Sequence, residues 1–313
     1  MTTRTDALPL LPRRAATGHK GTFGTVAIVG GCCAGGSRMI GAPALAALAA
    51  LRAGAGLAKL AVPAPILEAA ILLTPSATGL DLPVDAAGHL IAHEAAAVLD
   101  LLFESANCIV IGPGMGNGEG VQGAALRCIQ QESVPVVVDA DALNALAQTP
   151  ELGRDFRART ILTPHPGEFQ RLATSLKISH DPVTPATRPF AAEALAQRLG
   201  CVVVLKGAGT VVSDGITTWV CTRGHPCLGT AGTGDVLAGL IGGLVAQFAR
   251  NPPRPGAAAG PGQLTLLDAA RLAVQAHAVA GEGWAKSRHA GAGMLASELA
   301  DLLPAVLEEL REK

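Results

Sequence analysis

The chain has 313 residues, of which 49% are hydrophobic and 16% are charged, and its formal net charge is −1. This composition supplies enough apolar side chains for a large core and excludes a chain that is disordered throughout. The small charge and an aromatic content of 3%, with no tyrosine, disfavour a nucleic-acid-binding protein, which needs basic patches and stacking surfaces.

Seven cysteines are scattered through the chain, and no CxxC pair occurs among them. Most lie in apolar, strand-like runs, so we expect buried, reduced thiols in a cytoplasmic protein. The apolar run 236–249 is too short to cross a bilayer, and the N-terminal segment has no apolar signal core. We therefore expect neither secretion nor a membrane partner.

Short β-branched runs alternate with stretches rich in alanine and leucine, which is the pattern of a parallel sheet covered by helices on both faces. In chain order, the expected strands are Thr25–Val29, Leu57–Val62, Cys108–Ile111, Val134–Val138, Thr160–Leu162, Cys201–Leu205, Val211–Ser213 and Thr217–Cys221. The expected helices are Ala42–Ala53, Ala64–Leu73, His93–Glu104, Val121–Glu132, Ala142–Gln148, Glu168–Ser175, Phe190–Leu199, Gly234–Arg250, Leu264–Lys286 and Ala296–Glu312.

The last two strands are separated by Asp214-Gly215, which predicts an antiparallel hairpin beside a mostly parallel sheet. We expect one α/β domain over residues 1–313, with 1–15 as a flexible tail. The Pro/Gly-rich segment 251–263 is expected to be a surface loop between two helices and not a linker between domains.

The most informative motif is GTAGTGDVLAG at 229–239, in which a glycine-rich turn runs into an apolar helix. The first N–H groups of a helix have no intrahelical partner, and the helix dipole helps them to bind anions. We therefore expect the backbone of Gly232, Thr233 and Gly234 to form an anion hole for a phosphoryl group. Asp235 follows, where its carboxylate can take a proton from an attacking hydroxyl. The alternative is that Asp235 is only a favourable charge at a helix N-terminus.

A second glycine-rich stretch, GGCCAGG at 30–36, does not give a clean GxGxxG, and no acidic residue follows about 20 residues later. A hydride-transferring dinucleotide-binding enzyme is therefore disfavoured.

Several further stretches occur in a specific order: HKGTFGTVAIVGG (19–31), GAPALAALAALRAGAGL (41–57), GPGMG (112–116), VVDADALNAL (137–146), ILTPHPGEFQRL (161–172) and VVLKGAGTVV (203–212). Together with AGTGD they resemble the ADP/ATP-dependent NAD(P)H-hydrate dehydratase family of the ribokinase-like superfamily, over roughly residues 15–305. The resemblance implies a ribokinase-like three-layer αβα sandwich.

It also implies a lyase that repairs the S form of hydrated NADH or NADPH. The terminal phosphoryl group of ADP or ATP, with Mg²⁺ as cofactor, is transferred to the ring hydroxyl, and phosphate then departs to restore NAD(P)H. Phosphoryl transfer of this kind needs positioning and charge stabilisation more than covalent help.

The resemblance implies specific roles for residues that match the family motifs. Asp235 is implied as the catalytic base, and the implied contacts of the hydrated NAD(P)H are Ala42, Gly116, His165 and Asp235. The implied contacts of the adenine nucleotide are Lys206, Gly207, Ala208, Gly209, Thr210 and Gly234. Structural alternatives are a solvated lysine at a strand-ending turn for Lys206, a loop histidine for His165 and a plain turn at Gly116.

Other polar residues keep two interpretations. Glu168 either caps the helix that follows it or acts through a water bound to Mg²⁺. Asp139, Asp141 and Asn144 at a strand end either serve Mg²⁺ or cap the next helix, so we assign no metal ligands. His277 and His289 have no metal-ligand spacing and are expected to be structural.

The chain departs from the family pattern before the GTGD core, at His225, Cys227, Leu228 and Ala231. Alanine at 231 is expected to restrict the anion loop. The resemblance further implies a homotetramer and, because few residues precede His19, an NAD(P)H-hydrate epimerase on a separate chain.

Two other functions compete with the dehydratase. The first is a small-molecule kinase of the same fold, acting on a vitamin-precursor or sugar alcohol. The second is an inactive nucleotide-binding module, which the presence of Asp235 and Lys206 disfavours. Neither the preference for ADP or ATP nor that for the NADH or NADPH hydrate follows from the sequence.

Overall fold

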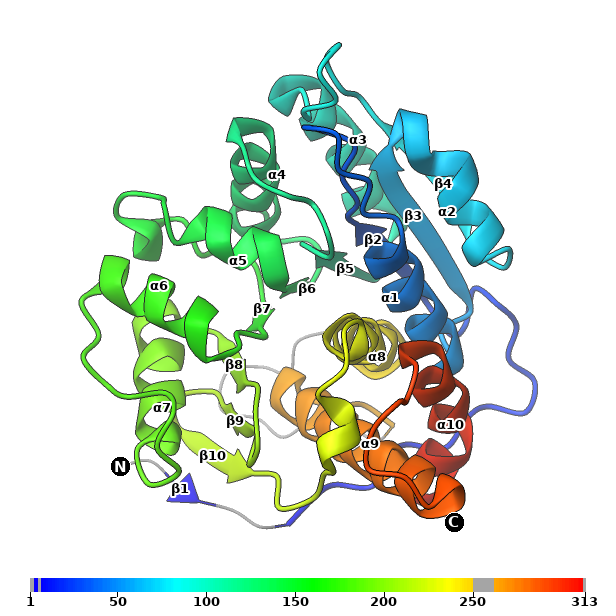
Figure 1. The fold of residues 1–313 in the computed structure, drawn as a ribbon, viewed down its shortest axis with the longest axis vertical. Helices are drawn as coiled ribbons and strands as arrows, with labels where there is room; N and C mark the ends of the chain where they lie inside the picture. Colours follow the sequence, from blue (N-terminus) through cyan, green and yellow to red (C-terminus); the bar gives the residue numbers. More distant parts are fainter. Residues whose placement is uncertain (1–2, 5–6, 250–261, 312–313) are drawn as a thin grey trace.

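The chain folds around one ten-stranded sheet, which is seen nearly edge-on in Figure 1. The structure is a computed structural model, and it describes residues 3–4, 7–249 and 262–311. The strands lie in the order β1-β10-β9-β8-β7-β6-β5-β2-β3-β4. Their bounds are β1 Thr3–Arg4, β2 Thr25–Val29, β3 Leu57–Pro63, β4 Thr78–Leu82, β5 Cys108–Ile111, β6 Val136–Val138, β7 Thr160–Leu162, β8 Val202–Leu205, β9 Val211–Ser213 and β10 Thr217–Val220.

Pairing is parallel throughout except at β9, which runs antiparallel to both β8 and β10. The predicted hairpin over Asp214-Gly215 is therefore confirmed, and so is the mostly parallel sheet. Asp214 closes the turn, because its carboxylate accepts the N–H groups of Ile216 and Thr217.

Helices cover both faces of the sheet, as the alternating pattern predicts (Figure 1). One layer contains α3 Ala92–Ser105, α4 Glu119–Gln130, α5 Ala140–Leu146, α6 Pro166–Leu176 and α7 Arg188–Leu199. The other contains α1 Gly41–Arg52, α2 Leu67–Leu73, α8 Thr233–Phe248, α9 Leu266–Arg288 and α10 Ala296–Glu309.

Strand side chains divide between two cores because successive residues of a strand point to opposite faces. In β2, Val26 and Ile28 belong to the core under α1, α8 and α9, whereas Ala27 and Val29 belong to the core under α3 to α7. All five β2 residues are buried. The result is the three-layer αβα sandwich that the sequence predicts.

The expected strands and helices are found, with their ends shifted by a few residues. The structure differs from the expectations in three places: the start of helix 64–73, an edge strand and the N-terminal segment. Helix 64–73 begins with a 3₁₀ turn, Ala64–Ile66, before α2 starts. The edge strand β4 was not predicted, because its sequence TGLDL contains glycine and aspartate, which are rare in strands. The expected helix ends at Arg250 and Glu312, and most of the expected loop 251–263, lie outside the described residues.

The third difference concerns the N-terminal segment, which was expected to be a flexible tail. Thr3–Arg4 pairs with β10, and Leu11 is fully buried while its N–H donates to the carbonyl of Leu310. The apolar side chain of Leu11 thus fastens the described part of the segment beside the end of α10.

All seven cysteines are buried, as predicted, and none is in a disulfide among the described residues. None of the described helices combines the length and apolar character that crossing a bilayer requires.

Helix α8 lies against α1 through glycines, and this close contact generates a prediction about stability. A Cβ at Gly239 would lie 2.0 Å from the carbonyl oxygen of Ala46, so the two backbones touch. We expect Gly239→Ala to lower the free energy of unfolding by about 3 kcal/mol or more, because neither backbone can move freely.

The matched control is Gly283→Ala on α9, where an added Cβ meets nothing within 4 Å. There the better helix propensity of alanine should raise stability by about 0.5–1 kcal/mol. Urea unfolding of both variants measures the difference, and similar stability of the two would contradict the close α1–α8 contact.

Candidate functional site

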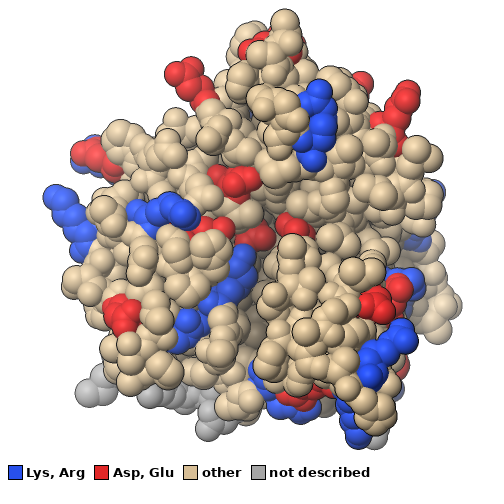
Figure 2. Space-filling model, in the orientation of Figure 1, with Lys and Arg blue, Asp and Glu red and all other residues tan. Residues whose placement is uncertain are grey.

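The site lies at the carboxyl ends of the central parallel strands, where open α/β sheets bind ligands. Asp139 follows β6, Thr163 and His165 follow β7, and Lys206 follows β8. These three strands are neighbours in the sheet, so residues far apart in the chain meet at one edge. In Figure 2 the molecular surface is hollowed near the centre of this view, and acidic and basic side chains gather around the hollow.

Lys206 is held by a buried network of carboxylates. Its Nζ lies 2.6 Å from Oδ1 of Asp139 and 3.8 Å from Oε2 of Glu168. Thr163 Oγ1 also donates to Asp139 Oδ1, at 2.7 Å. Burial opposes the charged ammonium, but Asp139 and Glu168 outweigh it, so the pKa of Lys206 lies above its ordinary value. Lys206 is therefore a fixed cation and not a solvated surface lysine.

Asp235 lies in the first turn of α8, close to this network. Burial raises the pKa of Asp235 to about 7, with contributions from the charges of Asp139 and Asp141, while Lys206 opposes the shift. A carboxyl group with a pKa near neutrality is suited to general-base catalysis. The favourable helix-terminal charge alone does not account for this environment.

The start of α8 is where the sequence predicts an anion site. Gly232 precedes the helix with φ +90°, a conformation that favours glycine. Thr233 turns its hydroxyl back to the carbonyls of Leu228 and Thr230, which fixes the loop. The N–H of Thr233 donates to the carbonyl of Thr230, so among the described residues the N–H groups of Gly234 and Asp235 are the ones left for a phosphoryl group.

Ala231 does not strain this loop. It is exposed, and unlike the glycine beside it, it does not adopt a positive φ. The expectation that alanine restricts the anion loop is therefore wrong, because the backbone there needs no glycine.

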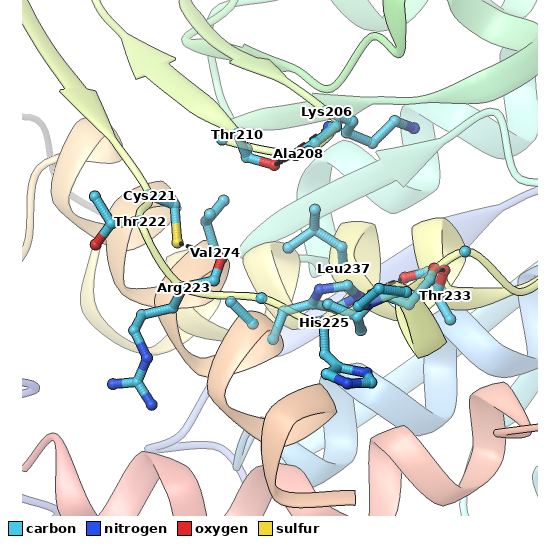
Figure 3. Close-up of a pocket in the computed structure, with 18 of the residues that line it drawn as sticks. Lys206, Ala208, Thr210, Cys221, Thr222, Arg223, His225, Thr233, Leu237 and Val274 are labelled. Carbon is cyan, nitrogen blue, oxygen red and sulfur yellow. Dashed lines mark hydrogen bonds between the residues drawn. The ribbon is translucent and has the colours of Figure 1, made fainter. Parts of the chain in front are cut away.

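A cavity of about 740 Å³ opens on one side of the network and contains the predicted nucleotide residues. Figure 3 shows Lys206, Ala208 and Thr210 on one wall and Leu237, His225 and Thr233 on the other. The loop 206–210 is closed by Thr210, whose Oγ1 accepts the N–H of Gly207 and donates to its carbonyl. Gly207, Gly209 and Gly234 also line this cavity, so the structure brings all six predicted nucleotide contacts together.

A second cavity, of about 940 Å³, is lined by Gly116, Asp141, Asn144 and Arg171, among others. The N–H of Gly116, at φ +71°, donates to Asp141 Oδ2 at 2.8 Å. Of the four predicted contacts of the hydrated dinucleotide, Gly116 lines this cavity. Ala42 lies just behind the 112–116 loop, because a Cβ at Gly114 would meet its methyl group at 3.2 Å.

The side chain of His165 stabilises the start of α6. It is the N-cap of α6, and its Nδ1 accepts the N–H groups of Gly167 and Glu168. Glu168 Oε2 accepts the N–H of His165 in return, which completes a capping box. The capping interpretation of Glu168 is therefore confirmed. Burial, and then Lys206 and Arg171, lower the pKa of His165.

The neighbouring polar residues do not cap α5 as one interpretation proposed. Asp139 occupies the N-cap position but makes no side-chain cap hydrogen bond, because it pairs with Lys206 and Thr163. Asp141 accepts the N–H of Gly116, and Asn144 accepts from Arg171 NH1 at 2.9 Å.

His277 is part of the site, which sequence reasoning missed. It lines the 740 Å³ cavity, and its Nε2 lies 2.9 Å from the carbonyl oxygen of Thr233. Burial lowers the pKa of His277 to about 4, so the ring is neutral at physiological pH. Only its position in a long amphipathic helix was visible in the sequence, and that position gives no sign of a cavity.

The carboxylates near Lys206 are the candidate ligands of Mg²⁺ in this site. Among the residues that the structure describes, no group of three or more His, Cys, Asp or Glu side chains is placed to hold a metal ion. Mg²⁺ is commonly held by one or two carboxylates together with substrate phosphates. Asp139 and Glu168, beside Lys206, fit that role but do not form a protein cage.

The fold and the arrangement of the site define a class of protein: a ribokinase-like α/β enzyme with a glycine-rich helix start at the carboxyl ends of its central strands. A ribokinase-like superfamily protein from Enterococcus faecalis has the same fold, with a TM-score of 0.73, 24% identity and coverage of 96% of this chain and 93% of that one.

The family model described as NAD(P)H-hydrate dehydratase matches residues 26–305, so the chain belongs to that family. The ADP-dependent (S)-NAD(P)H-hydrate dehydratase of Xanthomonas campestris is 38% identical over 306 residues, covering 97% of this chain and 95% of the relative. The structure of the ADP/ATP-dependent NAD(P)H-hydrate dehydratase from Bacillus subtilis, co-crystallized with ATP/Mg²⁺, matches with TM-score 0.73 and 28% identity over 98% of this chain and 100% of that one.

Other curated relatives are longer. The bifunctional NAD(P)H-hydrate repair enzyme of Moorella thermoacetica is 38% identical over 307 residues, which cover 97% of this chain and 53% of the relative. The chain thus spans about half the length of several curated relatives that it matches.

The raised pKa of Asp235 generates a prediction about stability. The folded protein holds this proton more tightly than the unfolded chain, whose aspartates titrate near 3.8, so wild-type stability falls as the pH rises through about 7. Asp235→Asn removes this cost. We expect the variant to exceed wild type in unfolding free energy at pH 8 by up to about 4 kcal/mol, and by clearly less at pH 5.

Denaturant unfolding of both proteins at the two pH values measures the effect. The variant is compared with wild type at the same pH, so a general loss of stability in acid affects both proteins and cancels in the difference between their unfolding free energies. A stability difference that does not change with pH would contradict the raised pKa.

Proposed function

We propose that this protein is an ADP- or ATP-dependent dehydratase of the S form of hydrated NADH and NADPH. The observation that carries the proposal is Asp235, a carboxyl group with a pKa of about 7 in the first turn of α8, close to the fixed cation Lys206. Family membership and the printed activities of the Xanthomonas and Bacillus relatives support the choice of substrate.

The proposed reaction has two steps. The adenine nucleotide occupies the 740 Å³ cavity, with its terminal phosphoryl group at the start of α8 and at Lys206. Asp235 accepts the proton of the ring hydroxyl while the hydroxyl oxygen attacks phosphorus and the bond to the nucleotide breaks, which turns ADP into AMP. The anion hole and Lys206 stabilise the charge on the transferring group.

The second step removes the phosphorylated oxygen. The lone pair of the ring nitrogen expels inorganic phosphate, the C–O bond breaks, and the neighbouring ring carbon loses a proton to restore the double bond of NAD(P)H. Phosphorylation is needed because hydroxide is a poor leaving group. The net reaction is hydrated NAD(P)H plus ADP giving NAD(P)H, AMP, phosphate and a proton.

Mg²⁺ bound to the nucleotide phosphates would neutralise part of their charge. In this proposal Asp139 and Glu168 each offer it a carboxylate oxygen. The remaining contacts of the hydrated dinucleotide are assigned to Ala42, Gly116 and His165; of these, Gly116 lines the 940 Å³ cavity and Ala42 lies behind the 112–116 loop.

The wider setting is also part of the proposal. The fused arrangement in relatives that are bifunctional NAD(P)H-hydrate repair enzymes supports an epimerase on a separate chain as functional partner. We further propose a single domain, a homotetramer and a cytoplasmic location, the compartment in which reduced thiols persist.

The test of the function is nucleotide-dependent repair. Hydrated NADH is incubated with the protein and Mg²⁺, with ADP, with ATP or without nucleotide, and NADH absorbance is followed together with released phosphate. We expect NADH and phosphate to appear in equal amounts and only when a nucleotide is present. Recovery of NADH without nucleotide would refute the mechanism, and a stable phosphorylated product would favour the small-molecule kinase.

Asp235→Asn tests the base in the same assay. Asparagine keeps the size of the side chain but cannot accept the proton, so kcat should fall by about 10²–10⁴-fold while ADP affinity changes little. In the wild-type enzyme kcat/KM should decline as the pH falls below about 7, because the carboxyl group must be ionised to act. Wild-type turnover by the folded variant would remove Asp235 from the mechanism.

A further inference from the structure

Arg188 is a buried cation behind the nucleotide loop, and neither the motifs nor the mechanism above uses it. It is the first residue of α7 and is 4% exposed. Its NH1 donates to the carbonyl of Pro182 at 2.7 Å, and its NH2 donates to the carbonyls of Leu205 at 2.9 Å and Lys206 at 3.1 Å. The guanidinium therefore bridges the junction between β8 and the loop 206–210.

This junction fixes the direction of Lys206. The N–H of Lys206 donates to the carbonyl of Pro164, its carbonyl accepts from Arg188, and its Nζ pairs with Asp139. The backbone on both sides of its Cα is thus tied down. Among the described residues, Arg188 is the only side chain that donates a hydrogen bond to the carbonyl of Lys206. Without Arg188, this carbonyl would lose that donor.

Gly207 separates the guanidinium from the cavity. It lines the cavity on one side, and on the other a Cβ at this position would lie 3.1 and 3.2 Å from the two terminal nitrogens of Arg188. Its φ of +141° also favours glycine. The absence of a side chain lets the loop lie directly against the cation.

The charge of Arg188 has no carboxylate within ion-pair distance among residues 3–4, 7–249 and 262–311, and its buried Nε has no hydrogen-bond partner there. Burial lowers the pKa of Arg188, and the more distant Asp181 only partly offsets this. An uncompensated buried cation is costly, and a nearby anion reduces the cost. The cavity lies on the far side of Gly207 from the guanidinium and is open to an anionic ligand.

We propose that Arg188 is a positioning residue of the nucleotide site. It holds the backbone at 205–207 so that Lys206 and the N–H groups of the loop face the nucleotide phosphates, and those phosphates in turn compensate its charge. This inference rests on the proposed function only in requiring that an adenine nucleotide binds the 740 Å³ cavity.

The experiment compares Arg188→Met and Arg188→Lys with Arg271→Met. Arg271 is a control of similar burial, because it is 5% exposed and has buried nitrogens without partners, but its guanidinium pairs with Asp268 and not with the loop 206–210. ADP and adenosine are titrated into each protein by calorimetry, without the hydrated dinucleotide, and each variant is also melted. Steady-state kinetics then give KM for the nucleotide and for the hydrate.

We expect Arg188→Met to weaken ADP binding about tenfold or more and adenosine binding clearly less, because the lost interactions act on the phosphates. Arg188→Lys should recover part of the loss, since it keeps the charge. Arg271→Met should bind ADP as wild type does. KM for the nucleotide should rise in Arg188→Met while KM for the hydrate stays close to wild type.

Equal ADP affinity in wild type and either folded Arg188 variant would overturn the inference, as would equal losses for ADP and adenosine. If Arg188→Met does not fold, Arg188→Lys decides. Failure of the proposed function gives a different result, because wild-type protein would then bind no ADP or would not repair the hydrate.

Discussion

The site depends on the buried ion pair between Lys206 and Asp139, which joins the ends of β8 and β6 across β7. Removing one member of such a pair leaves a buried charge without compensation, at a cost of about 3–5 kcal/mol. The pair also sets the charge of its surroundings. Asp139 raises the pKa of Asp235 while Lys206 lowers it, so the balance between two neighbours adds to burial in bringing this carboxyl near neutrality.

The charge balance explains why a nucleotide site and a proton acceptor can share one edge of the sheet. Asp139, Glu168 and Asp235 face a single lysine, so a fully ionised cluster would repel phosphates. Burial raises the pKa of Glu168 as well as that of Asp235, while the charge of Lys206 acts in the opposite direction on both. In the proposed reaction the phosphoryl group lies at the helix start and at Lys206, and the ionised carboxylate of Asp235 accepts the proton of the hydroxyl.

Strands and helix starts depend on the local sequence pattern and were predicted from the sequence. Contacts that depend on the order of the strands in the sheet were missed. β-Branched runs identified eight strands, and GTGD identified the start of α8, because composition and glycine position determine these features locally. The Lys206–Asp139 pair spans 67 residues and exists because β6, β7 and β8 are neighbours in a sheet. His277 was missed for the same reason, since its partner Thr233 lies 44 residues earlier on another helix.

The segment 223–228, before GTGD, makes a set of contacts with one turn of α9. Cys227 donates its Sγ–H to the carbonyl of Gly281, and Leu228 packs where a side chain at Gly281 would stand. Arg223 and the N–H of Gly224 both bond Glu282, the next residue of the helix. These contacts hold one wall of the 740 Å³ cavity against α9. The cavity is thus organised before any ligand arrives, and binding needs to order less of the chain.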